Sequence, residues 1–198
     1  MMRILILFLL LSHPLQAEEF PALFAVTGVA DDDVLNIRAR PDAGSPIIGS
    51  LAPDATGVEV IATRGNWALV NGGEGSGYAS MRFLTREPGP AWNALQAPLI
   101  CRGTEPFWSL EIDPQSRATR FLTPEDQAPA PESMTGVWPA EPWARSAAIG
   151  LPDGLAVLTG AECSDGMSDR SYGIVVDIFR TGPADERRLS GCCLLARP

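Results

Sequence analysis

The apolar residues in the first half of the chain fall into short stretches separated by turn-forming residues. Between residues 22 and 86, stretches of alternating apolar and polar positions are bounded by Gly, Pro, Asp and Asn. Turn signals at spacings of about 8–12 residues are typical of a small all-β barrel or sandwich. The pattern predicts strands at 24–30, 34–39, 47–51, 58–63, 67–70 and 77–79.

The second half of the chain has the same character after a break at residues 87–99, where the Glu-Pro-Gly-Pro run interrupts strand pairing. We expect this segment to be a linker and residues 100–198 to form a second, antiparallel β-barrel-like domain. The segment 123–142, rich in proline, is expected to be a long irregular loop. The predicted strands are 107–112, 118–122, 144–149, 155–158, 172–179 and 189–195.

The first 17 residues have the pattern of a secretory signal peptide: a positive start, an apolar run from Ile4 to Leu11, and Ala17 as a small residue for cleavage. The run is shorter than the roughly 20 residues that a membrane-spanning helix needs. A short buried helix is the alternative. No cysteine lies near the cleavage point to carry a lipid. We therefore expect residues 18–198 to be periplasmic or secreted, and not bound to the membrane after cleavage.

The charged residues exclude several classes of function. All 15 basic residues are arginine, and the one histidine, His13, lies in the predicted signal peptide. Histidine-dependent nucleophilic catalysis, histidine metal sites and lysine Schiff bases are therefore not expected. A formal net charge of −9 argues against nucleic acid as a partner. The sequence predicts no enzyme, no cofactor and no metal.

Four cysteines, all in the second half, indicate two disulfides in an exported chain. Cys192 and Cys193 are adjacent, and adjacent side chains of a strand point to opposite faces, so they are expected to take different partners. Two pairings satisfy this condition. Of these we predict Cys163–Cys192, which would tie the turn after Cys163 to the last strand, and Cys101–Cys193.

A series of short motifs in the first module resembles the bacterial SH3 (SH3b) family. The motifs are LNIRARP from Leu35, IGSL from Ile48, VEV from Val58, WALV from Trp67, GYA from Gly77 and the closing FL at Phe83. The resemblance implies an SH3-like small β-barrel over about 26–86 that binds peptidoglycan or an envelope protein. Its candidate ligand-binding residues are Asn36, Arg38, Trp67 and Tyr78, although core or rim packing is the alternative role of Trp67.

Three motifs in the second module resemble those of a family of proteobacterial envelope proteins, over about 100–195. They are CRGTEPFW from Cys101, CSDGMSDRSY from Cys163 and LSGC from Leu189. Their polar residues either form a surface network that fixes a turn, or a recognition site. A catalytic pair of carboxylates is a weaker alternative. The candidate recognition residues are Glu105, Trp108, Asp165, Asp169 and Arg170.

These observations together predict an exported, non-catalytic binding protein of the cell envelope. The acidity of the chain also fits an inhibitor of a basic enzyme such as lysozyme, since opposite charge speeds encounter. A cell-wall hydrolase is the third alternative, and the residues that the usual wall-cutting chemistries need are missing.

Overall fold

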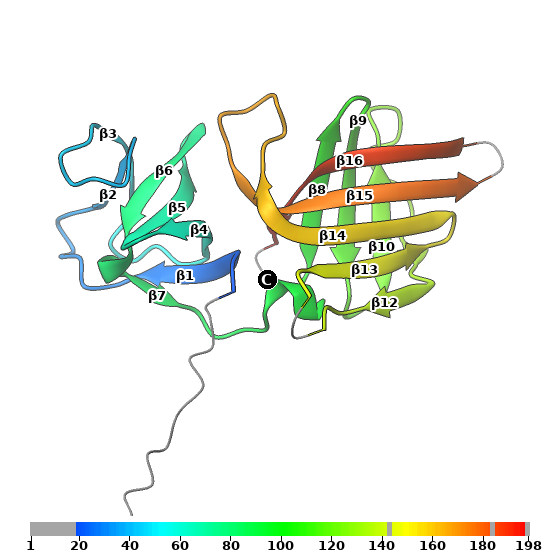
Figure 1. The fold of residues 1–198 in the computed structure, drawn as a ribbon, viewed down its shortest axis with the longest axis horizontal. Helices are drawn as coiled ribbons and strands as arrows, with labels where there is room; N and C mark the ends of the chain where they lie inside the picture. Colours follow the sequence, from blue (N-terminus) through cyan, green and yellow to red (C-terminus); the bar gives the residue numbers. More distant parts are fainter. Residues whose placement is uncertain (1–18, 142–143, 183–184, 197–198) are drawn as a thin grey trace, which may run out of the picture.

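The computed structural model describes residues 19–141, 144–182 and 185–196, which form two β-sheets lying side by side (Figure 1). The all-β fold class is thereby confirmed. The predicted signal peptide, residues 1–17, lies outside the described residues. Among the residues described, no helix combines the length and the apolar composition that crossing a membrane requires.

The N-terminal unit is a seven-stranded antiparallel sheet in the order β3-β2-β6-β5-β4-β1-β7. Strand β1 pairs with β4 on one side and with the short edge strand β7 on the other. Its core contains Phe24, Ile37, Val60 and Val70, none of which is more than 1% exposed. The strands are β1 (Ala22–Val26), β2 (Leu35–Arg38), β3 (Ile47–Leu51), β4 (Val58–Arg64), β5 (Trp67–Gly72), β6 (Gly75–Ser80) and β7 (Leu84–Arg86), with the 3-10 turn η1 (Met81–Phe83) before β7.

The C-terminal unit is a nine-stranded sheet in the order β11-β10-β9-β8-β16-β15-β14-β13-β12 that curls into a half-barrel (Figure 1). A second apolar core fills its inside, with Leu110, Ile149, Leu158 and Ile174 almost fully buried. The strands are β8 (Leu99–Thr104), β9 (Phe107–Asp113), β10 (Ala118–Leu122), β11 (Glu132–Ser133), β12 (Gly136–Trp138), β13 (Ser146–Leu151), β14 (Gly154–Cys163), β15 (Tyr172–Gly182) and β16 (Asp185–Leu195).

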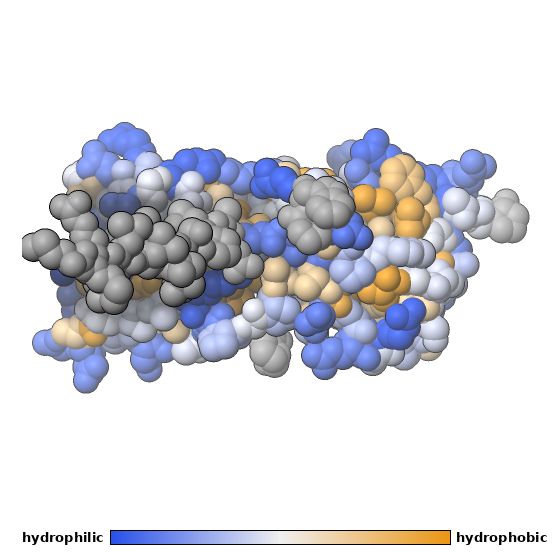
Figure 2. All heavy atoms as spheres, turned by 60° about the horizontal axis from the view of Figure 1, so that its bottom comes forward, coloured by the Kyte–Doolittle hydropathy of each residue, from blue (hydrophilic) through white to orange (hydrophobic). Residues whose placement is uncertain are grey.

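The outside of the C-terminal unit shows the alternation that a half-barrel requires. On the face drawn in Figure 2, its apolar surface is broken into separate patches by hydrophilic residues. The exposed apolar side chains of the C-terminal unit include Phe107, Trp138 and Phe179. Within each strand the neighbouring side chains turn inward, so the sequence alternation and the curl of the sheet agree.

The segment expected as a linker belongs partly to the C-terminal unit. A 3-10 turn, η2 (Trp92–Ala94), places Trp92 and Leu95 in the second core, 4% and 3% exposed. Strand β8, which the sequence pattern did not predict, starts at Leu99 and pairs with β9 and β16. The expected irregular loop also contains the short strands β11 and β12, which form the two edges of the sheet.

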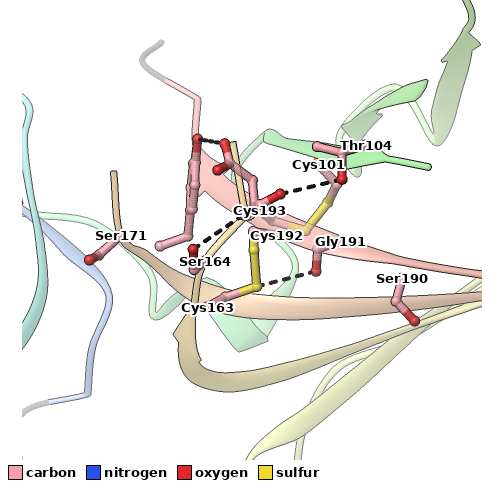
Figure 3. Close-up of a disulfide and its surroundings, with 12 residues drawn as sticks. Cys101, Thr104, Cys163, Ser164, Ser171, Ser190, Gly191, Cys192 and Cys193 are labelled. Carbon is pink, nitrogen blue, oxygen red and sulfur yellow. Dashed lines mark hydrogen bonds between the residues drawn. A yellow bond between two sulfur atoms is a disulfide. The ribbon is translucent and has the colours of Figure 1, made fainter. Parts of the chain in front are cut away.

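Two disulfides join the last strand to distant parts of the C-terminal unit, with the predicted pairing. Cys193 of β16 bonds Cys101 of β8, its register partner, and Cys192 bonds Cys163 at the end of β14. Figure 3 shows the two bridges leaving β16 on opposite sides, as adjacent strand residues require. The second bridge anchors the loop between β14 and β15 to the sheet.

Candidate functional site

The four candidate residues of the N-terminal unit lie on one face of its sheet. Arg38 is opposite Tyr78 in the ladder, and Trp67 is opposite Ser80, two residues further along β6. Facing residues in an antiparallel pair share a side, and so do residues two apart. Asn36 is two residues before Arg38, so it shares this side too. We call this side, opposite the one that buries Ile37, the outer face.

The Arg38 side chain also has a structural role on the outer face. Its guanidinium Nη1 donates a hydrogen bond of 2.7 Å to the carbonyl oxygen of Ser45, which holds the loop between β2 and β3 against the sheet. The hydroxyl of Ser45, itself buried, accepts the N–H of Arg40. A ligand of the outer face would therefore contact an arginine whose position is fixed by the loop.

Asp165 of the C-terminal unit organises the loop between β14 and β15. Its carboxylate accepts the N–H groups of Met167 and Ser168, at 3.0 and 2.9 Å, and the hydroxyls of Ser168 and Tyr172. Partial burial works to raise the pKa of Asp165, but these donors outweigh it and hold the pKa at about 2. The arrangement is that of a turn-capping carboxylate with its lone pairs already occupied.

Asp169 and Arg170 contact the N-terminal unit. The Arg170 guanidinium donates to the carbonyl oxygen of Gly73 at 2.8 Å, at the tip of the β5–β6 hairpin. Asp169 forms a β-bridge with Gly75, and its carbonyl oxygen accepts the hydroxyl of Ser76. Figure 1 shows this loop, drawn in orange between β14 and β15, rising beside the hairpin. The polar motif thus recognises another part of the same chain.

Two further contacts complete this docking. The Asn71 side-chain amide donates to the carbonyl oxygen of Ser171 at 2.9 Å, and the N–H of Ser171 lies 2.6 Å from the hydroxyl oxygen of Ser76. The tight β5–β6 turn that presents these groups requires a positive φ at Gly73, +61°. Asn71 and Ser76 are on the outer face, so the C-terminal unit covers the hairpin end of that face.

The remaining two candidates of the C-terminal unit lie apart from this loop contact. Trp108 is 5% exposed and stacks on Phe121 with 5.8 Å between ring centroids, so most of its ring is core. Glu105 is exposed just before β9 and makes no hydrogen bond or ion pair with any described residue. The five candidate residues therefore do not converge on a single site.

A cleft of about 1030 Å³ between the two units was not predicted from the sequence. Its walls come from segments that are far apart in the chain: the residues before β1, the end of β4, the end of β7 with the connection after it, the residue before β13, and strands β14 and β15. No local motif marks these residues. The lining residues are Glu19, Phe20, Ile61, Ala62, Thr63, Arg64, Arg86, Gly89, Ala91, Trp92, Arg145, Gly160, Ala161, Glu162 and Gly173.

The cleft gathers positive charge in an acidic protein. Of its two carboxylates, that of Glu162 forms an ion pair with Arg64 across the cleft, and that of Glu19 accepts the side-chain amide of Asn93. Arg86 donates only to the backbone carbonyl oxygen of Glu19, at 3.4 Å. Arg145 has no side-chain partner in the described ranges. Two guanidinium groups thus lack a carboxylate partner.

The described residues contain no group of three or more His, Cys, Asp or Glu side chains placed to hold a metal ion. The side chains at the outer face and in the cleft include arginines, aromatic rings, an asparagine and two glutamates. Of these, the arginines and aromatic rings bind carboxylates, sugars and extended peptides.

Residues 33–85 match the family model of the bacterial SH3 domain. The match spans β2 to β7 and includes Asn36, Arg38, Trp67 and Tyr78. No curated protein and no solved structure matches the chain. The resemblance of the C-terminal unit to envelope proteins stays a prediction.

Proposed function

We propose that this chain is an exported, non-catalytic binding protein of the bacterial cell envelope whose outer face docks to peptidoglycan. The observation that carries the proposal is the bacterial SH3 domain at residues 33–85, because such domains serve as binding modules. The predicted signal peptide would deliver the chain to the compartment where peptidoglycan lies.

The outer face offers chemistry suited to a glycan or a wall peptide. Trp67 and Tyr78 are half-buried, so each presents part of a ring to solvent while the rest is fixed by the sheet. Such rigid aromatic surfaces bind sugars and peptides at low entropic cost. Asn36 and Arg38 add an amide and a guanidinium on the same side. The free end of this face lies away from the docked β5–β6 hairpin tip.

A sacculus pull-down with the purified protein tests the proposal. The protein is mixed with purified sacculi at low salt and pelleted, and the bound fraction is measured against sacculus concentration. We expect Trp67→Ala and Tyr78→Ala each to weaken binding about fivefold to thirtyfold, the effect of losing about 1–2 kcal/mol of aromatic contact. Phe179→Ala removes an exposed ring from the C-terminal unit and is the matched control.

Two results would count against peptidoglycan. If the wild-type protein stays in the supernatant at low salt, the ligand of the outer face is a protein of the envelope instead. If all three variants pellet like the wild type, the binding face lies elsewhere. Melting curves of the variants establish that each one is folded.

A further inference from the structure

Both walls of the inter-domain cleft contain strand backbone without a ladder partner. On one wall, β1 pairs with β4 only as far as Ala22 opposite Val60, so residues 62–64 pair with β5 alone. On the other wall, the β14 register is interrupted between Gly160 and Cys163. Within the described ranges no strand pairs with these edges, although the carbonyl oxygen of Thr63 accepts Arg64 Nη1 at 3.1 Å and the N–H of Gly160 donates to the carbonyl oxygen of Arg145 at 2.9 Å. Such an edge is a template for an added strand.

The charges that face this open backbone select the kind of peptide that would pair with it. Arg86 and Arg145 carry guanidinium groups without a carboxylate partner, and both line the cleft. Guanidinium groups bind carboxylates through paired N–H donors, and such charge-assisted bonds are stronger than neutral ones. The chain as a whole has a net charge of −9, which repels an acidic peptide from most of its surface. The cleft is therefore the place where such a peptide finds complementary charge.

The wall also has an apolar part, and it includes a donor without a partner in the described part of the chain. Phe20, Ile61 and Trp92 contribute apolar surface to the lining. The indole N–H of Trp92 is buried and has no hydrogen-bond partner among the described residues. The cleft volume is close to the upper limit of about 1,000 Å³ for small-molecule ligand sites.

We propose that the inter-domain cleft binds an extended acidic peptide. The peptide backbone pairs with residues 62–64 of β4, and its carboxylates meet Arg86 and Arg145. This site is separate from the outer face that the proposed function uses. Binding of sacculi at the outer face and binding of peptide in the cleft can therefore succeed or fail independently.

Isothermal titration calorimetry with the purified protein tests the proposal. The probe is the capped hexapeptide acetyl-Ala-Glu-Ala-Glu-Ala-Glu-amide, whose carboxylates share one side when it is extended. We expect saturable binding, with about tenfold lower affinity for the peptide in which Gln replaces each Glu. N-methylation of alternate backbone amides removes ladder donors and is expected to reduce affinity by at least fivefold.

Arginine variants locate the site. Arg86→Ala and Arg145→Ala are each expected to weaken binding about fivefold to tenfold, as charge-assisted hydrogen bonds are lost. Arg120→Ala is the matched control, because Arg120 is exposed on β10 and its one ion-pair partner among the described residues is Glu111. Melting temperatures are compared to show that the variants are folded.

Three outcomes would overturn the proposal. These are the absence of saturable heat at millimolar peptide, equal affinity for the Glu and Gln peptides, and unchanged affinity in both cleft variants. Inorganic phosphate is titrated in parallel. If it displaces the peptide fully at equal concentration, the cleft is a general anion site and the peptide assignment is wrong.

Discussion

Replacing Glu59 with glutamine tests how the two units are held together. Glu59 lies on β4 of the N-terminal unit, and its Oε2 accepts the N–H of Leu195 at the end of β16, at 3.2 Å. Its other carboxylate oxygen is buried without a hydrogen-bond partner among the described residues. Burial raises the pKa of Glu59 from 4.5 to about 7, and the hydrogen bond from Leu195 lowers it by less.

The raised pKa fixes the direction of the pH dependence. Between pH 4.5 and about 7, the unfolded chain has released the Glu59 proton while the folded chain keeps it, so stability falls as pH rises. Each pKa unit corresponds to about 1.4 kcal/mol, so the full separation corresponds to about 3 kcal/mol. The neutral amide side chain of the Glu59→Gln variant avoids this loss and keeps an acceptor for the N–H of Leu195.

Urea unfolding of the wild type and Glu59→Gln at several pH values from 4.5 to 8 measures this effect. We expect the difference in free energy of unfolding, variant minus wild type, to increase by about 1–3 kcal/mol as pH rises across this range. Glu132→Gln, at an exposed position of β11, is the control and should show no such gain. Parallel pH profiles for wild type and Glu59→Gln would refute the burial of a carboxyl group at this contact.

Two further predictions concern the C-terminal unit. Replacing both cysteines of Cys101–Cys193 by Ala should lower the free energy of unfolding by ~4.6 kcal/mol, and the same change at Cys163–Cys192 should lower it by ~3.6 kcal/mol. The difference arises because the first disulfide closes the longer loop. Equal urea midpoints for the two variants would contradict this prediction. Asp165→Asn should cost about 1–2 kcal/mol at pH 7, and the difference should shrink as pH falls from 4 towards 2, where the wild-type carboxylate gains its proton. Urea titrations at pH 7 and pH 2 measure it, and a constant difference would contradict the capping role.

The alternation of the sequence predicts those features of the fold that depend on neighbouring residues. Leu35 and Ile37 point into the core while Asn36 and Arg38 point outward, as a period of two requires. The same period separates the partners of Cys192 and Cys193. The side on which Asn36 and Arg38 lie was predictable for this reason, whereas Trp67 and Tyr78 were candidates because of the resemblance to the bacterial SH3 family.

Strand β8 and the burial of Trp92 could not be predicted from the sequence pattern. Strand β8 contains Arg102 and Gly103, and its partner β16 follows about 90 residues later, so neither composition nor spacing marks it as central. Trp92 lies beside a proline-rich break, yet the core that buries it comes from β13 and β14. Contacts across such separations are properties of the assembled sheet.

The Asp169–Arg170 motif shows the same difference between what neighbouring residues predict and what only the folded chain determines. Exposed polar residues clustered in a loop indicate recognition, but the sequence does not say whether the partner is another molecule or the same chain. Here the partner is the β5–β6 hairpin, and the recognition is largely of backbone groups at Gly73 and Gly75. A composition rich in glycine contains no pattern that would identify the hairpin as that partner.

The docking of the two units determines what the cleft can do. Contacts join them at the hairpin through Arg170 and Gly73, at the end of β16 through Leu195 and Glu59, and across the cleft through Arg64 and Glu162. Because separate contacts bound the cleft, its width is fixed. Its strand edge is therefore preorganised for a peptide, and binding requires little ordering of the protein. The Glu59 contact therefore links the urea test to the peptide titration. If ionisation of Glu59 at high pH opens this contact, peptide binding should weaken before either core unfolds.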